Sequence, residues 1–165
     1  TNFPERLLPS FEHTVGITPA TIIGESAALR KVQIATRAYN LEEMGARSGI
    51  FKDVKAHSLG SAVIKEVLRR VNVLQDEVDE VIMGQVLTAG SGQNPARQAA
   101  VSANIPISKP AYLVNQVCGS GLRAVISGYQ SIKLGEIKQV ITGGQENMSM
   151  APHSILSRYG KKMSS

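Results

Sequence analysis

Segments of helical periodicity alternate with short apolar segments through most of this chain. The helical segments, with apolar positions three and four residues apart, are residues 59–71, 95–103 and 120–135. The apolar segments have the length and β-branched content of buried strands, and they are residues 78–87, 111–114 and 139–142. This alternation is typical of parallel βαβ units with right-handed crossovers. We therefore predict an α/β fold with a mainly parallel sheet flanked by helices, and Ser58 as the N-cap of the first helix.

The single cysteine, Cys118, lies between the strand that ends at Val114 and the helix that follows. Backbone N–H groups at a helix N-terminus favour the thiolate, and Gly119 and Gly121 leave room for a substrate beside the sulfur. A lone cysteine is more often a small buried core residue. The order strand, Cys-Gly-x-Gly, helix instead favours a nucleophile. Because residues 143–147 also follow a strand, we expect them at the same edge of the sheet as Cys118.

Composition limits the class of protein. A chain of 165 residues, 42% of them hydrophobic, can form one domain, and no segment reaches the roughly 18 apolar residues of a membrane span. The net charge of +5 is spread along the chain and aromatic residues make up only 4%, which argues against nucleic-acid binding and suits an anionic, phosphate-bearing substrate. One cysteine excludes an internal disulfide, and no residues have metal-ligand spacing. We therefore expect an intracellular protein without a metal.

Four longer motifs occur in order along the chain. They are Glu-Val-Ile-Met-Gly-Gln-Val-Leu at 80–87, Gly-Gln-Asn-Pro-Ala-Arg-Gln-Ala at 92–99, Asn-Gln-Val-Cys-Gly-Ser-Gly-Leu-Arg-Ala at 115–124, and Gly-Gly-Gln-Glu-Asn-Met-Ser-Met-Ala-Pro-His at 143–153. The third resembles the nucleophile signature of the thiolases, enzymes that make or cleave the carbon–carbon bond of 3-ketoacyl-CoA, and the others match the same family. The resemblance extends from Gly49 to Met163. Its last motif is more similar to the short-chain thiolases, the acetyl-CoA acetyltransferases, although the family commonly has Met where this chain has Gln145.

The resemblance also implies a domain organisation. Thiolases consist of two similar βαβαβαββ halves, and residues 49–148 correspond to the βα core of the first. Residues 149–165 correspond to the truncated start of the family's loop domain. Residues 1–48 are unmatched, with a weak candidate for the first strand at 31–38, and are a transit peptide, an unrelated extension or a product of mis-joined coding segments. Five acidic residues before Met44 argue against the transit peptide. We therefore expect a thiolase-like N-terminal half that is incomplete at both ends.

The resemblance implies roles for individual residues. Cys118 would be the acyl-thioester nucleophile, and its backbone N–H an oxyanion donor. The substrates would be coenzyme A thioesters, with no cofactor, and the reaction the condensation of two acetyl-CoA to acetoacetyl-CoA and CoA, or the reverse thiolysis. The implied substrate-binding residues are Met148, His153 and Met163. The residues with an implied structural role at the site are Gly119, Gly121, Gly143, Gly144 and Asn147.

Other parts of a thiolase site are not found in this sequence. The family places a second, acid/base cysteine, a Gly-His-Pro histidine and an Asn-Glu-Ala segment in its second half, and none of these motifs occurs here. We therefore expect the chain to be inactive alone. In the full-length family we expect a homodimer or a dimer of dimers, with a cytoplasmic location or else a mitochondrial or peroxisomal one. Arg97 and Gln98 are interpreted as structural or interface residues, and His57 as a surface or capping residue.

Two other functions fit parts of the pattern. Ketoacyl synthases also use a cysteine, but their nucleophile usually follows Ala and precedes a serine-rich run, unlike residues 116–119. A noncatalytic interaction fragment that retains only dimer contacts fits the sequence as well.

The strand order implied by the resemblance predicts low stability for the isolated chain. In the thiolase half-fold the first strand lies centrally, between the second and the fourth. The candidate for that position, residues 32–38, contains Arg37, which is poorly suited to a strand covered on both faces. A missing fifth strand would leave the fourth with an unpaired edge. We therefore expect an isolated chain that is marginally folded, aggregation-prone or dependent on a partner.

Overall fold

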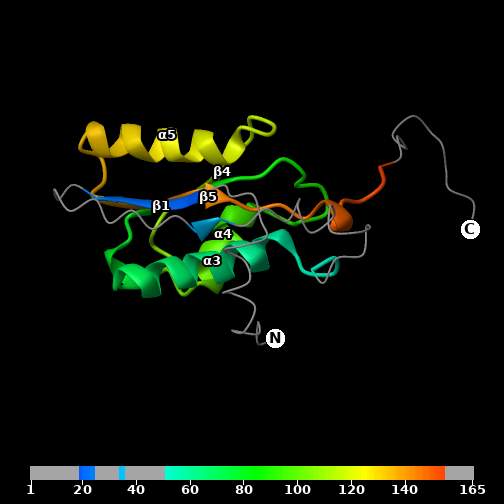
Figure 1. Cartoon of the computed structure of the whole chain (residues 1–165), viewed down its shortest axis with the longest axis horizontal. Helices are drawn as coiled ribbons and strands as arrows, with labels where there is room; N and C mark the ends of the chain where they lie inside the picture. Colours follow the sequence, from blue (N-terminus) through cyan, green and yellow to red (C-terminus); the bar gives the residue numbers. More distant parts are fainter. Residues whose placement is uncertain (1–18, 25–33, 36–50, 155–165) are drawn as a thin grey trace, which may run out of the picture.

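The fold is that of a computed structural model, which describes residues 19–24, 34–35 and 51–154. Met163, Arg37 and most of the unmatched first 48 residues lie outside the described residues. Within them, a sheet is covered by helix α5 on one face and by helices α3 and α4 on the other (Figure 1). This arrangement confirms the α/β fold with helices flanking a mainly parallel sheet.

From residue 56 to residue 144 the helices and strands lie close to the segments expected from the sequence, whereas strand β1 was not expected. They are β1 (Pro19–Gly24), β2 (Ile34–Ala35), α3 (Ala56–Val71), η2 (Gln75–Glu77), β3 (Glu80–Gly84), α4 (Pro95–Ser102), β4 (Ala111–Val114), α5 (Ser120–Lys133), β5 (Gln139–Gly144) and η3 (Met148–Met150). The expected N-cap at Ser58 is wrong. The N–H groups of Ser58 and Leu59 already bond to the carbonyl of Lys55, so Lys55 is the cap and Ser58 lies within the helix.

Strands β5, β3 and β4 are parallel neighbours, in a sheet of order β2-β1-β5-β3-β4. Their register is fixed by backbone pairing. Gly84, the last residue of β3, pairs with Val114 at the end of β4 and with Gly144 at the end of β5. The segments that follow β4 and β5 therefore leave the sheet at one edge, as the alternation of elements predicts.

Two expectations about strand order are wrong. No strand separates β3 from β5, because these two pair directly, and β2 lies at the margin of the sheet beside β1. The other edge of β5 is not open either, since β1 pairs with it in antiparallel fashion, Thr21 opposite Thr142. β5 is an apolar inner strand whose backbone groups need partners, and the Pro19–Gly24 segment supplies them. The pairing of β1 with β5 thereby removes the unpaired edge as a reason for marginal stability, while Arg37 lies outside the described residues.

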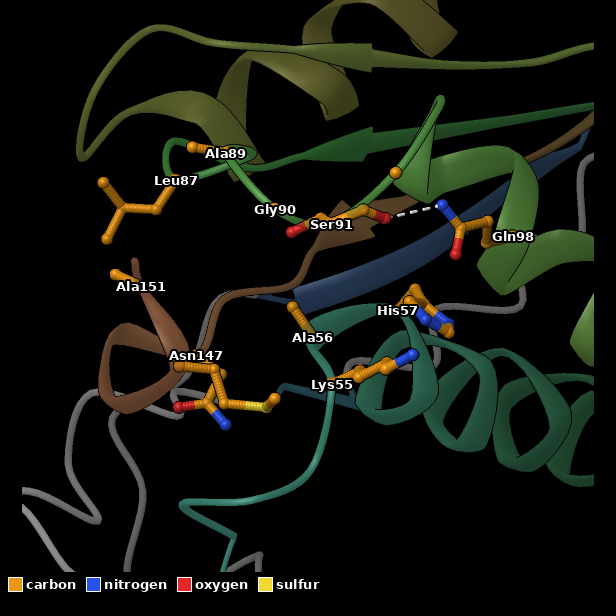
Figure 2. A pocket seen from close by; sticks show the side chains of 12 residues that line it. Lys55, Ala56, His57, Leu87, Ala89, Gly90, Ser91, Gln98, Asn147 and Ala151 are labelled. Carbon is orange, nitrogen blue, oxygen red and sulfur yellow. Dashed lines mark hydrogen bonds between the residues drawn. The ribbon is translucent and has the colours of Figure 1, made fainter. Parts of the chain in front are cut away.

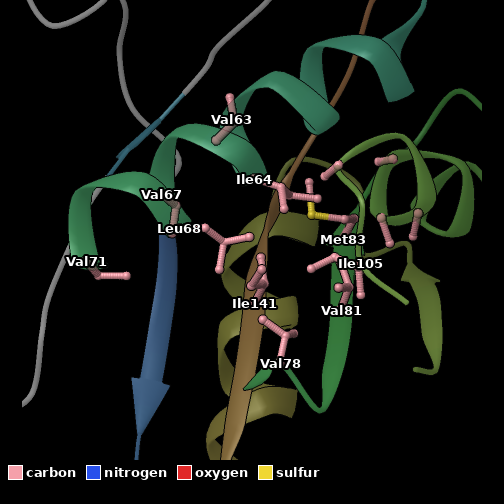
Figure 3. Packing of buried hydrophobic residues seen from close by; sticks show 14 residues of the cluster. Val63, Ile64, Val67, Leu68, Val71, Val78, Val81, Met83, Ile105 and Ile141 are labelled. Carbon is pink, nitrogen blue, oxygen red and sulfur yellow. The ribbon is translucent and has the colours of Figure 1, made fainter. Parts of the chain in front are cut away.

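The main core lies between α3, α4 and the sheet (Figure 3). Helix α3 presents large aliphatic side chains, whereas α4 presents alanines that let it approach closely. The buried members from α3, β3, β5 and α4 are Val63, Ile64, Val67, Leu68, Val71, Val81, Met83, Ile141, Ala96, Ala99 and Ala100. Full burial of each large aliphatic side chain contributes about 1.5–3 kcal/mol, so this face supplies much of the folding free energy.

Helix α5 packs on the sheet through small residues. Gly121, Ala124 and Gly128 are buried, and a Cβ on Gly128 would lie 2.6 Å from Cγ2 of Thr142. Three of the large apolar residues whose spacing indicates the helix in the sequence point away from the sheet, whereas Ile132 packs against the cluster of Ile82, Ala124 and Val140. Leu122, Ile126 and Tyr129 are 63%, 38% and 49% exposed. We call these three side chains the outer apolar face of α5.

Candidate active site

Cys118 is exposed at the turn between β4 and α5. The turn is closed by backbone hydrogen bonds from the N–H of Gly119 to the carbonyl of Gln116 (3.0 Å) and from the N–H of Ser120 to that of Val117 (3.1 Å). Val117 has a left-handed backbone, with φ of +49°. This conformation is unfavourable for a β-branched residue, and such strain is concentrated at functional sites. The turn thus presents the thiol at the N-terminal end of α5.

Two side chains hold this strained turn. Oδ1 of Asn115 accepts a hydrogen bond from the N–H of Val117 at 3.0 Å. Oγ of Ser120 accepts one from the N–H of Gln116 at 2.9 Å and donates to the carbonyl of Val117 at 2.6 Å. The backbone groups on the N-terminal side of Cys118 therefore have side-chain partners, which offset the strain at Val117.

Glycines allow the first turn of α5 to lie directly on the strand ends. A Cβ on Gly84 would be 2.4 Å from the carbonyl carbon of Ser120 and 2.5 Å from the nitrogen of Gly121. A Cβ on Gly144 would be 3.5 Å from Cα of Gly121, an ordinary contact distance, so the close approach requires glycine at 84. Of the other glycines singled out in the sequence, Gly119 is the N-cap of α5 and Gly143 is buried within β5.

Asn147 joins the end of β5 to the segment before α3. Its side chain is buried, and Nδ2 donates to the carbonyls of Phe51 (2.9 Å), Lys52 (3.3 Å) and Val54 (2.6 Å). Oδ1 accepts from the N–H of Ser149 at 3.0 Å. A side chain committed to four backbone groups orders two loops at the edge of the sheet.

Gln145, the departure from the family pattern, is buried beside Gln85. Its Nε2 donates to Oε1 of Gln85 at 2.9 Å, and Nε2 of Gln85 donates to the carbonyl of Leu87 at 2.9 Å. Its own Oε1 is buried without a partner among the described residues, and a Cβ on Gly60 would lie 1.9 Å from it. The polar residue at 145 is thus accommodated by a second glutamine and by a helix glycine.

Glu146 is a site residue that the sequence reasoning missed. Its carboxylate accepts hydrogen bonds from the N–H groups of Val86 (2.8 Å) and Leu87 (3.3 Å) in the loop after β3. Burial raises the pKa of Glu146 above its usual value, although these two hydrogen bonds oppose the shift. A carboxylate two residues after a Gly-Gly strand end was the available signal.

The three implied substrate-binding residues are not assembled around Cys118 by the described part of the chain. Met148 lies on η3 with its side chain 45% exposed, and His153 is exposed beyond it. Met163 lies outside the described residues.

A cavity of about 310 Å³ lies at this edge, between the start of α3 and the loop after β3 (Figure 2). Its lining residues are Lys55, Ala56, His57, Leu87, Ala89, Gly90, Ser91, Gly92, Gln98, Asn147, Met150 and Ala151, so it includes none of Cys118, Met148 and His153. Burial, and then the charge of Lys55, lower the pKa of His57, and its Nδ1 is buried without a partner among the described residues. This cavity is therefore separate from the thiol.

Arg97 and Gln98 make structural contacts. The Arg97 guanidinium donates to the carbonyls of Ile107 and Lys109. Nε2 of Gln98 donates to the carbonyls of Ser91 (2.8 Å) and Gln93 (2.9 Å), the first drawn in Figure 2. These contacts fix the loops around α4, in agreement with the structural interpretation.

The described ranges contain neither a candidate metal site nor a helix that could cross a membrane. No group of three or more His, Cys, Asp or Glu side chains there could hold a metal ion. No helix in those ranges has the length and apolar character needed to cross a membrane.

Comparison with known proteins agrees with this geometry. The profile of the family described as "Thiolase, N-terminal domain" matches residues 37–165. Acetyl-CoA acetyltransferase of Rhizobium meliloti (strain 1021) is 56% identical over 120 residues, which cover 73% of this chain and 30% of that protein. The cytosolic acetyl-CoA acetyltransferase of Rattus norvegicus is 53% identical over the same shares. The acetyl-CoA acetyltransferase of Pseudomonas aeruginosa is 51% identical over 110 residues, 67% of this chain and 28% of the relative.

The fold and the site define an α/β protein with a mainly parallel sheet and an exposed cysteine at a strand–helix turn. The chain belongs to the thiolase family. It spans about 30% of the length of the curated relatives it matches.

Proposed function

We propose that this chain is the nucleophile-bearing part of an acyl-CoA C-acyltransferase of the thiolase type. The observation that carries the proposal is the exposed Cys118 at the strained turn before α5, in a chain that is 56% identical over 120 residues to an acetyl-CoA acetyltransferase. The proposed reaction condenses two acetyl-CoA to acetoacetyl-CoA and CoA, or reverses this by thiolysis. Coenzyme A thioesters are the proposed substrates, and no cofactor takes part.

Cys118 would act through a thioester intermediate. Its thiolate attacks the carbonyl carbon of acetyl-CoA, an S–C bond forms, and the bond to the CoA sulfur breaks, so that CoA leaves and takes up a proton. The carbanion of a second, deprotonated acetyl-CoA then attacks the acyl-cysteine carbonyl and releases the Cys118 thiolate. The backbone N–H of Cys118 is one proposed oxyanion donor. The resemblance places the required acid/base groups in the family's second half.

Other features of the family are proposed for the full-length protein. Met148, His153 and Met163 would line the acyl-CoA site once the rest of the polypeptide is present. The assembly would be a homodimer or a dimer of dimers, and the role would lie in lipid metabolism. We propose a cytoplasmic location because the rat relative is named as cytosolic.

The test is acyl transfer by a chimera in which this chain is continued by the C-terminal part of the R. meliloti relative. We expect Cys118→Ser to abolish acetoacetyl-CoA thiolysis and the acetyl adduct detected by mass spectrometry, with an unchanged circular dichroism spectrum. The matched control is Gln130→Ala, an exposed change near the far end of α5, which should keep activity. Thiolysis retained by Cys118→Ser would remove the assignment.

A further inference from the structure

A continuous set of hydrogen bonds leads from Glu146 to the turn that carries Cys118. The Glu146 carboxylate accepts the N–H of Val86 at 2.8 Å. The carbonyl of Val86 accepts Nδ2 of Asn115 at 3.5 Å, a long hydrogen bond, and Oδ1 of Asn115 accepts the N–H of Val117 at 3.0 Å. The path crosses from the end of β5 to the loop after β3 and then to the end of β4, so it joins three strand ends at one edge.

We propose that Glu146 and Asn115 are positioning residues for Cys118. The Glu146 carboxylate accepts the N–H groups of Val86 and Leu87 and fixes the peptide between these two residues. The carbonyl of this peptide orients the Asn115 amide, which holds Val117 in its left-handed conformation. The inference rests on the proposed role of Cys118 as the nucleophile. It adds a positioning role for two residues that act on the turn and do not touch substrate.

The backbone of Val117 needs hydrogen bonds that keep it in its left-handed conformation. A β-branched residue at φ of +49° is strained and returns to an ordinary conformation unless its surroundings prevent this. Val117 precedes Cys118 directly, so its relaxation would rotate the Cys118 backbone and move the thiol from its place at the turn before α5. The thiol would then leave the exposed position in which the turn presents it.

Alkylation by iodoacetamide measures this in the 165-residue chain, because Cys118 is its single cysteine. The rate is followed by mass spectrometry over a range of pH, and each rate is divided by that of the same variant unfolded in concentrated guanidinium chloride. We expect Glu146→Gln and Asn115→Ala each to slow the reaction about fivefold at neutral pH, because the thiol is no longer held in its exposed position. The double variant should react at the rate of the slower single variant, within about twofold, since both act along one path.

Asp79→Asn is the matched control. The Asp79 carboxylate also accepts two backbone N–H groups, those of Lys138 (2.8 Å) and Gln139 (3.0 Å), but at the opposite end of the same strands. It should lower stability without changing the alkylation rate. The second control is the Val117→Gly background. Glycine adopts positive φ without strain, so Glu146→Gln should lose its effect there.

Each outcome decides the proposal. Rates equal to wild type in both single variants, or slowing that multiplies in the double variant, would overturn it. An effect of Glu146→Gln that persists at full size in the Val117→Gly background would also overturn it. If Glu146→Gln does not fold, Glu146→Asp is substituted and the same comparison is made. Alkylation needs no acyl transfer, so this result is independent of the chimera test of the proposed function.

Discussion

Gly84 has no side chain, and this lets the first turn of α5 lie directly against the end of strand β3. A Cβ at this position would lie 2.4 Å from the carbonyl carbon of Ser120, and backbone of this kind cannot move aside as a flexible side chain does. The position of Cys118 therefore depends on a residue 34 positions earlier in the sequence, 118 minus 84.

Gly84→Ala is expected to destabilise the fold by about 2–3 kcal/mol through overpacking and to displace the Cys118 turn. Urea unfolding gives the loss of stability, and iodoacetamide gives the change in thiol reactivity. Gly135→Ala is the control, because Gly135 has φ of +75° with nothing within 4 Å of its added Cβ. It should cost about 1 kcal/mol through backbone strain and leave alkylation unchanged. Wild-type stability and reactivity in Gly84→Ala would refute the close-approach argument.

Helix α3 has a buried acidic residue, Glu66, on the face that it packs into the protein. Glu66 is only 7% exposed, and its carboxylate accepts hydrogen bonds from Arg69 (2.7 and 2.8 Å) and Arg70 (2.8 Å), one helical turn away. The Arg69 hydrogen bond, with that from Arg70, lowers the pKa of Glu66 to about 2, against the opposing effect of burial.

This cluster predicts a pH dependence of stability. Because the folded pKa of Glu66 lies below its unfolded value, its contribution is complete above about pH 4.5 and is lost as pH falls towards about 2. Glu66→Gln should therefore be less stable than wild type by about 1–2 kcal/mol at pH 7, a figure reduced for the exposure of Arg69, and equal to it near pH 2. Guanidinium unfolding at both pH values measures the difference. A difference that is constant with pH would contradict the charge pairing.

At the scale of the whole molecule, the described part of the chain leaves the outer apolar face of α5 uncovered. Leu122, Ile126 and Tyr129 stand on the side of the helix opposite its buried glycines, and α5 forms one outer layer of the molecule (Figure 1). Contiguous exposed apolar residues on an isolated chain promote association.

The isolated chain is expected to self-associate through this face. Ile126→Glu should shift the sedimentation velocity distribution towards monomer, because it places a charge at the centre of the face. Leu74→Glu is the control, since Leu74 is 62% exposed at the start of η2 and away from α5. Equal association of the two variants would show that α5 is not responsible.

The isolated chain is also expected to have negligible thiolysis activity. General acid–base groups contribute roughly 10²- to 10⁴-fold each, and the family's acid/base cysteine and Gly-His-Pro histidine do not occur in this sequence. A coupled assay of acetoacetyl-CoA cleavage measures this, with circular dichroism as proof that the chain is folded and alkylation of Cys118 as proof that the thiol is accessible. Turnover within about tenfold of the full-length R. meliloti relative would contradict the expectation.

The sequence by itself determined the βα elements from residue 56 to 144 and the turn that carries Cys118. Helical spacing, β-branched runs and Gly-rich boundaries are local properties, so they can be recognised without knowledge of the fold. The Cys-Gly-Ser-Gly hinge could be recognised for the same reason, since strand, cysteine and helix are contiguous in the chain.

Only the tertiary structure decided how these parts meet. The pairing of Pro19–Gly24 with β5 joins segments more than 110 residues apart, 139 minus 24 being 115. Glu146 reaches Val86 across 60 residues, and the packing of α5 through its small residues leaves Leu122, Ile126 and Tyr129 on the outer side of the helix. Such contacts depend on which backbone donors remain unpaired and on where a missing Cβ permits close approach. Both conditions depend on several segments at once, so the positioning of Cys118 could not be obtained from periodicity and motifs alone.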